Sequence, residues 1–187
     1  MTPQTAPVRH DPPPSGQPEI ALARLTLRPI RRADMGPIEQ WTADRRVAEA
    51  TRSIPHPLPP GTTDAFVTRA LAGQRDEIAW IMDGAGASLP EVSGLIGLTP
   101  MDRDQAEIGF WVAPVMWTKG LATEAVRGLM DANPLGNAQI FGTVFQDNPA
   151  SARVLTNAGF DYIGDAEAFS VARGAVVPQW TYMRQMG

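Results

Sequence analysis

The feature that most restricts the fold is a short glycine-containing loop between an apolar strand and an amphipathic helix. The apolar run at 106–112 predicts the strand, and residues 117–122 (Trp-Thr-Lys-Gly-Leu-Ala) form the loop. Val126 and Leu129 then follow at helical spacing, which predicts a helix over about 120–132. The first turn of a helix leaves backbone N–H groups unpaired, so this loop suits an anionic ligand such as a pyrophosphate.

The side chains of the loop support an anion site without requiring one. Gly120 and Ala122 are small enough for a ligand to approach the backbone closely, and Lys119 adds a full positive charge. The alternative is an ordinary tight turn with a solvent-exposed lysine, and local sequence leaves both open. Glu124 lies in the first helical turn, where a negative charge suits the helix dipole, and we interpret it as structural.

The remaining elements alternate between strands and helices. A first helix is expected to begin at the cap residue Asp34, and the proline-rich segment 54–60 predicts an irregular loop before the second helix. Short turns at 83–86 and 102–104 make their flanking strands antiparallel neighbours. The expected strands are 20–30, 78–82, 92–100, 106–112, 139–146, 160–164 and 179–184; the expected helices after the first are 62–74, 120–132 and 149–157.

This order, β-α-α-β-β-β-α-β-α-β-β, predicts one α/β (α+β) domain with a mixed, mostly antiparallel central sheet flanked by helices. The length of 187 residues fits one domain. Residues 1–19 are rich in proline and poor in apolar side chains, which predicts an extended or disordered tail before a domain spanning 20–187.

Composition excludes several classes of function. The absence of cysteine excludes disulfides, cysteine-ligated metals and a catalytic thiol, and we expect no metal cofactor. A net charge of −4 argues against a nucleic-acid partner. The sequence has no apolar run near the ~20 residues that span a bilayer and no secretory signal, so we expect no membrane partner and a cytoplasmic location.

Three segments together resemble a known family. They are Ala106-Glu107-Ile108-Gly109-Phe110-Trp111-Val112, the stretch from Trp117 to Ala125, and the stretch from Asn148 to Phe160. Their order and spacing resemble the GNAT acetyl-CoA-dependent N-acetyltransferases over about residues 20–185, within the branch of the ribosomal-protein N-terminal alanine acetyltransferases. The resemblance implies a GNAT-like fold, acetyl-CoA as cosubstrate and an amine acceptor.

The resemblance also implies where acetyl-CoA binds. The strand ending at Val112 should splay from its neighbour, so that pantetheine pairs with its free edge and the Val112 N–H polarises the thioester carbonyl. Thr118 stands where the branch commonly has glycine, and a positive φ there would strain a threonine. The implied cofactor-binding residues are Val112, Trp117, Lys119, Gly120, Leu121, Ala122, Thr123, Asn148 and Ser151.

An amine must lose its proton to attack a thioester, so the site needs a base. The resemblance implies Glu107 as that base, set against the alternative of a polar residue on an open strand face; Asp147 is the reserve candidate. Leu155 stands where many family members have a tyrosine that protonates the leaving thiolate. Ser151, or a bound water, is therefore our candidate acid.

The acceptor is expected to lie against the loop 52–60 and the helices beside it, with Trp41, Arg52 and His56 as candidate lining residues. The predicted reaction is direct acetyl transfer to a primary amine, either a protein N-terminus or a small molecule, by a monomer or homodimer. One alternative is a GNAT-fold domain that binds an acyl-CoA or regulates without turnover. Another is an unrelated nucleotide-binding α/β domain, which leaves the segment 148–160 unexplained.

Overall fold

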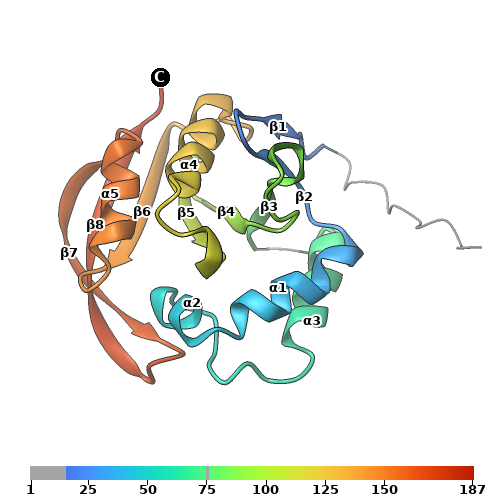
Figure 1. Ribbon diagram of the computed structural model, residues 1–187. Coiled ribbons are helices and arrows are strands. Elements are labelled where there is room, and N and C mark those ends of the chain that lie inside the picture. The colour runs from blue at the N-terminus through green and yellow to red at the C-terminus, as the bar shows by residue number, and fades with distance from the viewer. Residues whose placement is uncertain (1–15, 75) are drawn as a thin grey trace, which may run out of the picture.

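The computed structural model describes residues 16–74 and 76–187. Its described residues form an eight-stranded sheet in the order β1-β2-β3-β4-β5-β6-β8-β7, with helices on both faces (Figure 1). Only the β5–β6 pair is parallel within this sheet. The predicted fold class, a mixed and mostly antiparallel sheet flanked by helices, is confirmed. The strands are β1 Ile20–Ala21, β2 Thr26–Pro29, β3 Ile78–Asp83, β4 Gly94–Met101, β5 Gln105–Val112, β6 Gln139–Phe145, β7 Asp161–Ser170 and β8 Ala175–Gln185.

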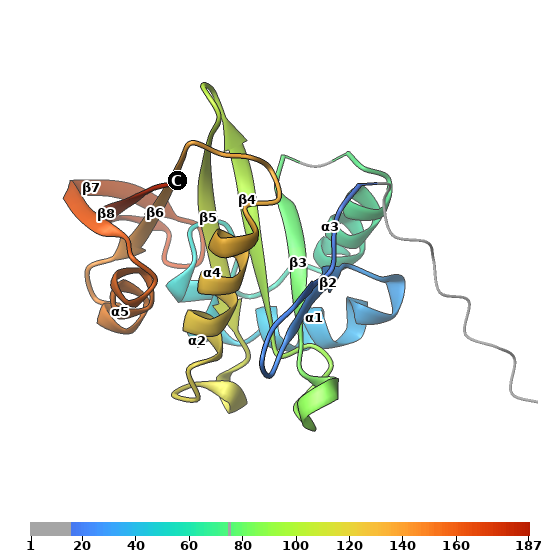
Figure 2. The ribbon, with the colours of Figure 1, turned by 90° about the horizontal axis from the view of Figure 1, so that it is seen from above.

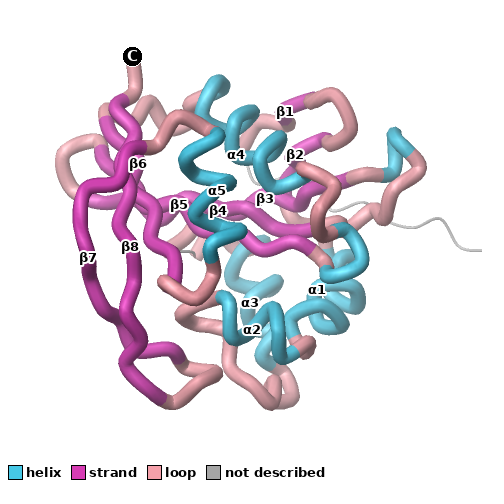
Figure 3. The backbone as a smooth tube through the Cα atoms, turned by 60° about the vertical axis from the view of Figure 1, so that its left-hand side comes forward, coloured by secondary structure: helices cyan, strands magenta, loops and turns pink. Residues whose placement is uncertain are grey.

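The helices divide between the two faces of the sheet. Helices α4 (Leu121–Ala132) and α5 (Pro149–Asn157) lie over one face, and α1 (Met35–Thr42), α2 (Arg45–Ala50) and α3 (Thr62–Leu71) lie over the other (Figures 1 and 3). Each layer has its own buried apolar cluster. The predicted ranges of α4 and α5 agree with the structure to within one residue.

Strand β3 shows why its sequence is apolar without alternation. Trp80 and Met82 are fully buried in the cluster beneath α4, whereas Ala79 and Ile81 are buried in the cluster beneath α1 and α3. A strand covered on both faces has no solvent side on which to place polar residues.

The centre of the sheet opens between β5 and β6. Their parallel pairing runs from Gln105 opposite Gln139 to Ile108 opposite Gly142, and no pair continues beyond these residues. Figure 2 shows α4 and α5 over these two strands. The predicted splay of the strand that ends at Val112 is therefore present.

The predicted first strand, 20–30, is wrong in its extent. The chain instead forms the antiparallel hairpin of β1 and β2, whose turn is closed by the Leu22 N–H donating to the Leu25 carbonyl at 2.8 Å. The Leu22 side chain packs on α4 at Gly128, where an added Cβ would overlap it. The apolar residue that suggested a continuous strand therefore contacts a helix.

The single helix expected between Asp34 and the proline-rich loop is two helices. Asp44 caps the second, α2, by accepting from the Arg46 N–H at 2.9 Å. Asp34 does not cap α1 through its side chain, because its carboxylate accepts from the Arg28 guanidinium at 2.8 and 2.9 Å and from the Arg31 N–H. Arg28 is 1% exposed, and it also contacts Asp83 at 2.6 Å.

The last two strands are much longer than the predicted 160–164 and 179–184. They form the β7–β8 hairpin, which extends along the edge of the sheet towards α2 (Figure 3). Strand β7 is largely exposed and β8 is only partly buried, so burial did not impose on them the clear apolar pattern on which sequence prediction depends.

Most of the predicted tail, residues 1–15, lies outside the described residues. Gln17 and Pro18, which belong to the same predicted tail, contact β3. The Gln17 amide donates to the Ala79 carbonyl at 2.8 Å, and the Trp80 indole donates to the Pro18 carbonyl at 2.9 Å. Contacts with the sheet thus begin before Ile20.

Candidate active site

The loop before α4 presents unpaired backbone donors. Gly120 is the N-cap residue with φ of 76°, and the first helical hydrogen bond runs from the Glu124 N–H to the Gly120 carbonyl. The N–H groups of Leu121, Ala122 and Thr123 precede that bond, so the helix gives them no carbonyl partner. Together with the helix dipole, these groups make a site for an anion.

Thr118 has φ of 64°, the left-handed conformation that glycine adopts most easily. The expectation that threonine is strained here is therefore met. Backbone strain of this kind recurs at ligand-binding loops because the surrounding structure holds it in place.

Arg24 braces the loop and was not singled out from the sequence. Its guanidinium donates to the Lys119 carbonyl at 2.7 Å and to the Glu124 carboxylate at 2.8 Å, and its own N–H donates to Glu124 at 2.7 Å. These contacts fit the structural interpretation of Glu124. They also place a second cation, besides Lys119, beside the backbone donors.

Trp117 joins the loop to the open edge of β5. Its indole N–H donates to the Val112 carbonyl at 2.8 Å, and the Arg46 guanidinium of α2 lies 5.2 Å from its ring centroid. The Ala113 N–H donates to Ser93 on the β4 side. Because backbone groups alternate along a strand, those of Phe110 and Val112 point to the other side, where β5 and β6 separate.

Asn148 and Ser151 form a closed pair at the start of α5. The Asn148 carbonyl oxygen Oδ1 accepts from the Ser151 N–H at 3.3 Å, and its Nδ2 donates to Ser151 Oγ at 3.0 Å. Asn148 is therefore the helix cap expected from the Asn-Pro sequence. The Ser151 hydroxyl hydrogen remains available to donate.

A pocket of about 600 Å³ is lined by residues of α1 and α3 on one face of the sheet, by the splayed strands β5 and β6, and by Ser151 and Leu155 of α5 on the other face. The candidate residues Glu107, Ser151 and Arg52 line it, and so does the loop after Arg52. Trp41 and His56, the other two candidates for the acceptor wall, are absent from its lining. Trp41 packs instead against the apolar cluster beneath α1 and α3. Other lining residues include Thr99, Phe110, Trp111, Thr143 and Phe145.

Glu107 stands in this pocket with two partners. Its Oε2 lies 2.8 Å from the Arg52 guanidinium, and its Oε1 accepts from the Thr143 hydroxyl at 2.9 Å. The Glu107 side chain is 23% exposed, so it faces the pocket without being sealed from it.

Asp147, the reserve base, lies outside the pocket lining. Its carboxylate pairs with Arg173 at 2.5 Å and is 60% exposed. The hydrogen bond from Arg173 lowers the pKa of Asp147, which makes it a weaker proton acceptor.

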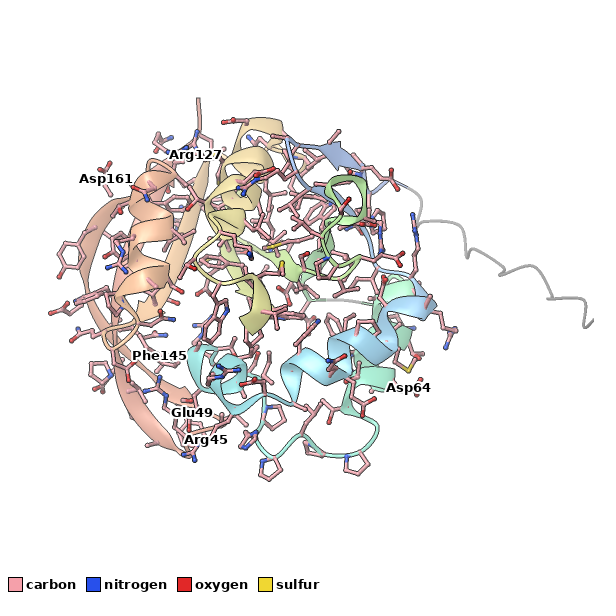
Figure 4. The ribbon with its side chains drawn as sticks, viewed as in Figure 1. Arg45, Glu49, Asp64, Arg127, Phe145 and Asp161 are labelled. Atoms are coloured by element: carbon pink, nitrogen blue, oxygen red, sulfur yellow. The ribbon has the colours of Figure 1, made fainter. Side chains whose placement is uncertain are left out.

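The tip of the β7–β8 hairpin holds the Arg52 segment in position. Arg173 donates twice to the Glu49 carbonyl, at 2.7 and 3.0 Å, and its guanidinium lies 4.8 Å from the Phe145 ring centroid. The Val171 N–H donates to the Arg52 carbonyl. Figure 4 shows Glu49 and Phe145 near one another, where α2 approaches the sheet edge.

Sequence reasoning missed Glu77, the residue just before β3. Its carboxyl lines the pocket, and burial, followed by the negative charge of Glu107, raises the pKa of Glu77. An added Cβ at Gly97 would overlap this carboxyl. Glycine inside a strand marks a close approach, so Gly97 opposite Gly109 was a signal that something packs there.

A family model described as the acetyltransferase (GNAT) domain matches residues 24–161. The chain belongs to the GNAT acetyltransferase family. It is 26% identical over 172 residues to the uncharacterized N-acetyltransferase p20 of Bacillus licheniformis, covering 85% of this chain and 91% of p20.

Solved structures share the fold of this GNAT domain. RimL, a ribosomal L7/L12 alpha-N-protein acetyltransferase in complex with CoA, superposes with a TM-score of 0.77 at 17% identity, covering 90% of this chain and 98% of RimL. Spermidine N-acetyltransferase from Vibrio cholerae, in complex with CoA and spermine, gives 0.73 at 18% identity, covering 87% and 96%. The ribosomal branch expected from the motifs is thus among the structural neighbours.

This GNAT domain is an acyltransferase, and acetyl-CoA is its cosubstrate. The free amides at α4 and the open edge of β5 fit that cosubstrate, because they offer donors for a pyrophosphate and for an amide-bearing arm. No group of three or more metal-binding side chains occurs within residues 16–74 and 76–187. Over the same residues, no helix has the length and apolar character needed to cross a membrane.

Proposed function

We propose that this GNAT domain transfers an acetyl group from acetyl-CoA to a primary amine, either a protein N-terminus or a small molecule. The amine attacks the thioester carbonyl directly while both substrates are bound. The observation that carries this proposal is that the splayed segment of β5 lines the same pocket as Glu107 and Ser151. A monomer or homodimer in the cytoplasm, with no nucleic-acid or membrane partner, remains our expectation.

The proposed acetyl-CoA site runs from α4 to α5. The amides of Lys119 to Thr123 bind the pyrophosphate, and Lys119 adds a partly solvated charge. Trp117 holds the loop against β5 through the Val112 carbonyl, which leaves the Val112 N–H to polarise the thioester carbonyl. Asn148 bonds the pantetheine arm.

The protons move through the pocket. Glu107 takes a proton from the amine, directly or through water, and its position beside Arg52 and Thr143 fixes its carboxylate for that step. Ser151, whose oxygen already accepts from Asn148, donates its hydroxyl proton to the leaving thiolate. A bound water is the other candidate for this acid.

Two observations favour a second candidate, an acyl-CoA-binding or regulatory domain without turnover. Leu155 has no hydroxyl to protonate a leaving thiolate, at a position where the family resemblance implies a tyrosine, and Glu107 is already engaged by Arg52. An inactive domain of this kind would bind acetyl-CoA and release no thiol.

Two measurements distinguish these functions. Calorimetry with acetyl-CoA tests binding, and free-thiol release with a panel of amines and N-terminal peptides tests turnover. Glu107→Gln should lower turnover about 100-fold, the usual contribution of a general base, with acetyl-CoA affinity retained. Glu167→Gln, on the exposed face of β7, is the matched control and should leave both unchanged. Unchanged turnover in Glu107→Gln would remove Glu107 from the reaction.

A further inference from the structure

Glu77 places a second glutamate carboxyl in the pocket. Within the described parts of the chain, no residue donates a hydrogen bond to Glu77 or forms an ion pair with it. Glu107, by contrast, is engaged by Arg52 and Thr143. Glu77 is half-buried. Withdrawing part of a carboxylate from water without giving it a partner is costly, so a ligand that supplies a positive charge would relieve that cost.

The sheet is built to admit this carboxyl. Gly97 on β4 and Gly109 on β5 are direct cross-strand partners, and Thr99 and Glu107 form the next pair on the same face. An added Cβ at Gly97 would overlap the Glu77 carboxyl, whereas one at Gly109 would stand 3.9 Å from it, an ordinary contact. The missing side chain at Gly97 thus provides the space in which Glu77 lies beside Glu107.

The chemistry of amine acetylation uses two proton acceptors when the acceptor arrives protonated. An ammonium ion loses one proton before its nitrogen can attack, and a second after the new C–N bond forms. The C–S bond breaks, the thiolate takes up one proton, and the other proton leaves to solvent.

We propose that Glu77 binds the acceptor as an ammonium cation and takes its first proton, and that Glu107 takes the second after the C–N bond forms. This inference rests on the proposed function and narrows the substrate class to amines that are protonated at neutral pH. Alkylamines and lysine-type amines, with pKa values of about 10.4, are almost fully protonated at neutral pH, whereas α-amino groups, with pKa values of about 7.7–8.0, are partly neutral.

The charged groups around Glu77 determine the pH dependence. Arg52, Arg69, Asp76 and Glu107 are the other charged residues that line the pocket in the described part of the chain. Burial and the charge of Glu107 raise the pKa of Glu77 above its usual value. Glu77 must be ionised to accept a proton, so kcat/KM should fall on the acid side at a pH above that of an ordinary glutamate.

The first test compares wild type and Glu77→Gln by thiol release, with n-butylamine and with an alanine N-terminal peptide. At pH 7, Glu77→Gln should lower kcat/KM for n-butylamine about 100-fold, and less for the peptide, whose amine is partly neutral. The rate of Glu77→Gln should then rise with pH as free amine accumulates. The variant should be at least as stable as wild type at pH 7, because it removes an unpartnered charge.

Two further variants keep the negative charge of Glu77, and one of them displaces it. Gly97→Ala displaces the Glu77 carboxyl and should lower kcat/KM for n-butylamine about tenfold or more, whereas Gly109→Ala should change it less than threefold. If Glu77→Gln does not fold, the comparison of Gly97→Ala with Gly109→Ala tests the role of Glu77.

The outcomes separate this inference from the proposed function. The role of Glu77 would be overturned if Glu77→Gln kept the activity and pH profile of wild type. It would also be overturned if the two alanine variants had equal effects. Either result would leave the proposed acetyl transfer intact. Turnover of the peptide without turnover of n-butylamine would overturn the preference for strongly basic amines. Binding of acetyl-CoA with no thiol release from any amine would refute the proposed function, and this inference with it.

Discussion

Replacing Thr118 with glycine should stabilise the protein, because Thr118 has φ of 64°. A left-handed conformation costs a residue with a Cβ roughly 1–2 kcal/mol. Glycine removes that cost but loses about 0.4–1 kcal/mol more backbone entropy on folding. The difference is a gain of roughly 0.5–1 kcal/mol in the free energy of unfolding, or about 1–4 °C in Tm for a chain of this size.

The assay is thermal and urea unfolding of the ligand-free protein. Thr68→Gly is the matched control, since Thr68 is an exposed residue inside α3. Glycine in a helix interior is unfavourable, so this control should lose about 0.5 kcal/mol. Opposite signs for the two substitutions would support strain at Thr118, and equal destabilisation would refute it.

The same variant tests whether the strained backbone is prearranged for acetyl-CoA. Glycine widens the range of loop conformations in the free protein, so binding should weaken about two- to fivefold, equivalent to about 0.4–1 kcal/mol. Calorimetry with acetyl-CoA measures this effect. Tighter binding by Thr118→Gly would mean that the threonine holds the loop in a conformation that opposes the ligand.

Two further predictions concern a side chain of the loop and the buried arginine. Lys119→Ala should weaken acetyl-CoA binding about tenfold, or roughly 1.4 kcal/mol, because the backbone amides supply most of the contacts; a loss of several hundredfold in calorimetry would reverse that ranking. Asp34→Asn should lower the free energy of unfolding by about 3 kcal/mol, because Arg28 keeps Asp83 but loses its bidentate partner. Urea unfolding measures this loss, and a change below about 1 kcal/mol would contradict it.

Local patterns were enough where a hydrogen bond or a turn joins neighbouring residues. The Asn148-Pro149 start of α5 was predicted correctly because a cap and its helix lie within one turn. The antiparallel pairing of β4 and β5 followed from the short turn at 102–104 for the same reason, whereas β3 and β4 are antiparallel neighbours across the longer connection 84–93. The length of the β7–β8 hairpin was underestimated because β7 is largely exposed and β8 only partly buried, and such strands carry little apolar alternation.

By itself, the sequence determined the fold class and the position of the glycine-containing loop before α4, and it proposed Glu107 and Ser151 as candidates, because each depends on short spacings or on a resemblance to a family. Only the tertiary structure decided what surrounds them. It brought Arg52 to Glu107, Arg24 to the loop and Glu77 into the space left by Gly97. Such contacts join residues far apart in the chain, and their formation depends on how strands and helices pack rather than on any local pattern.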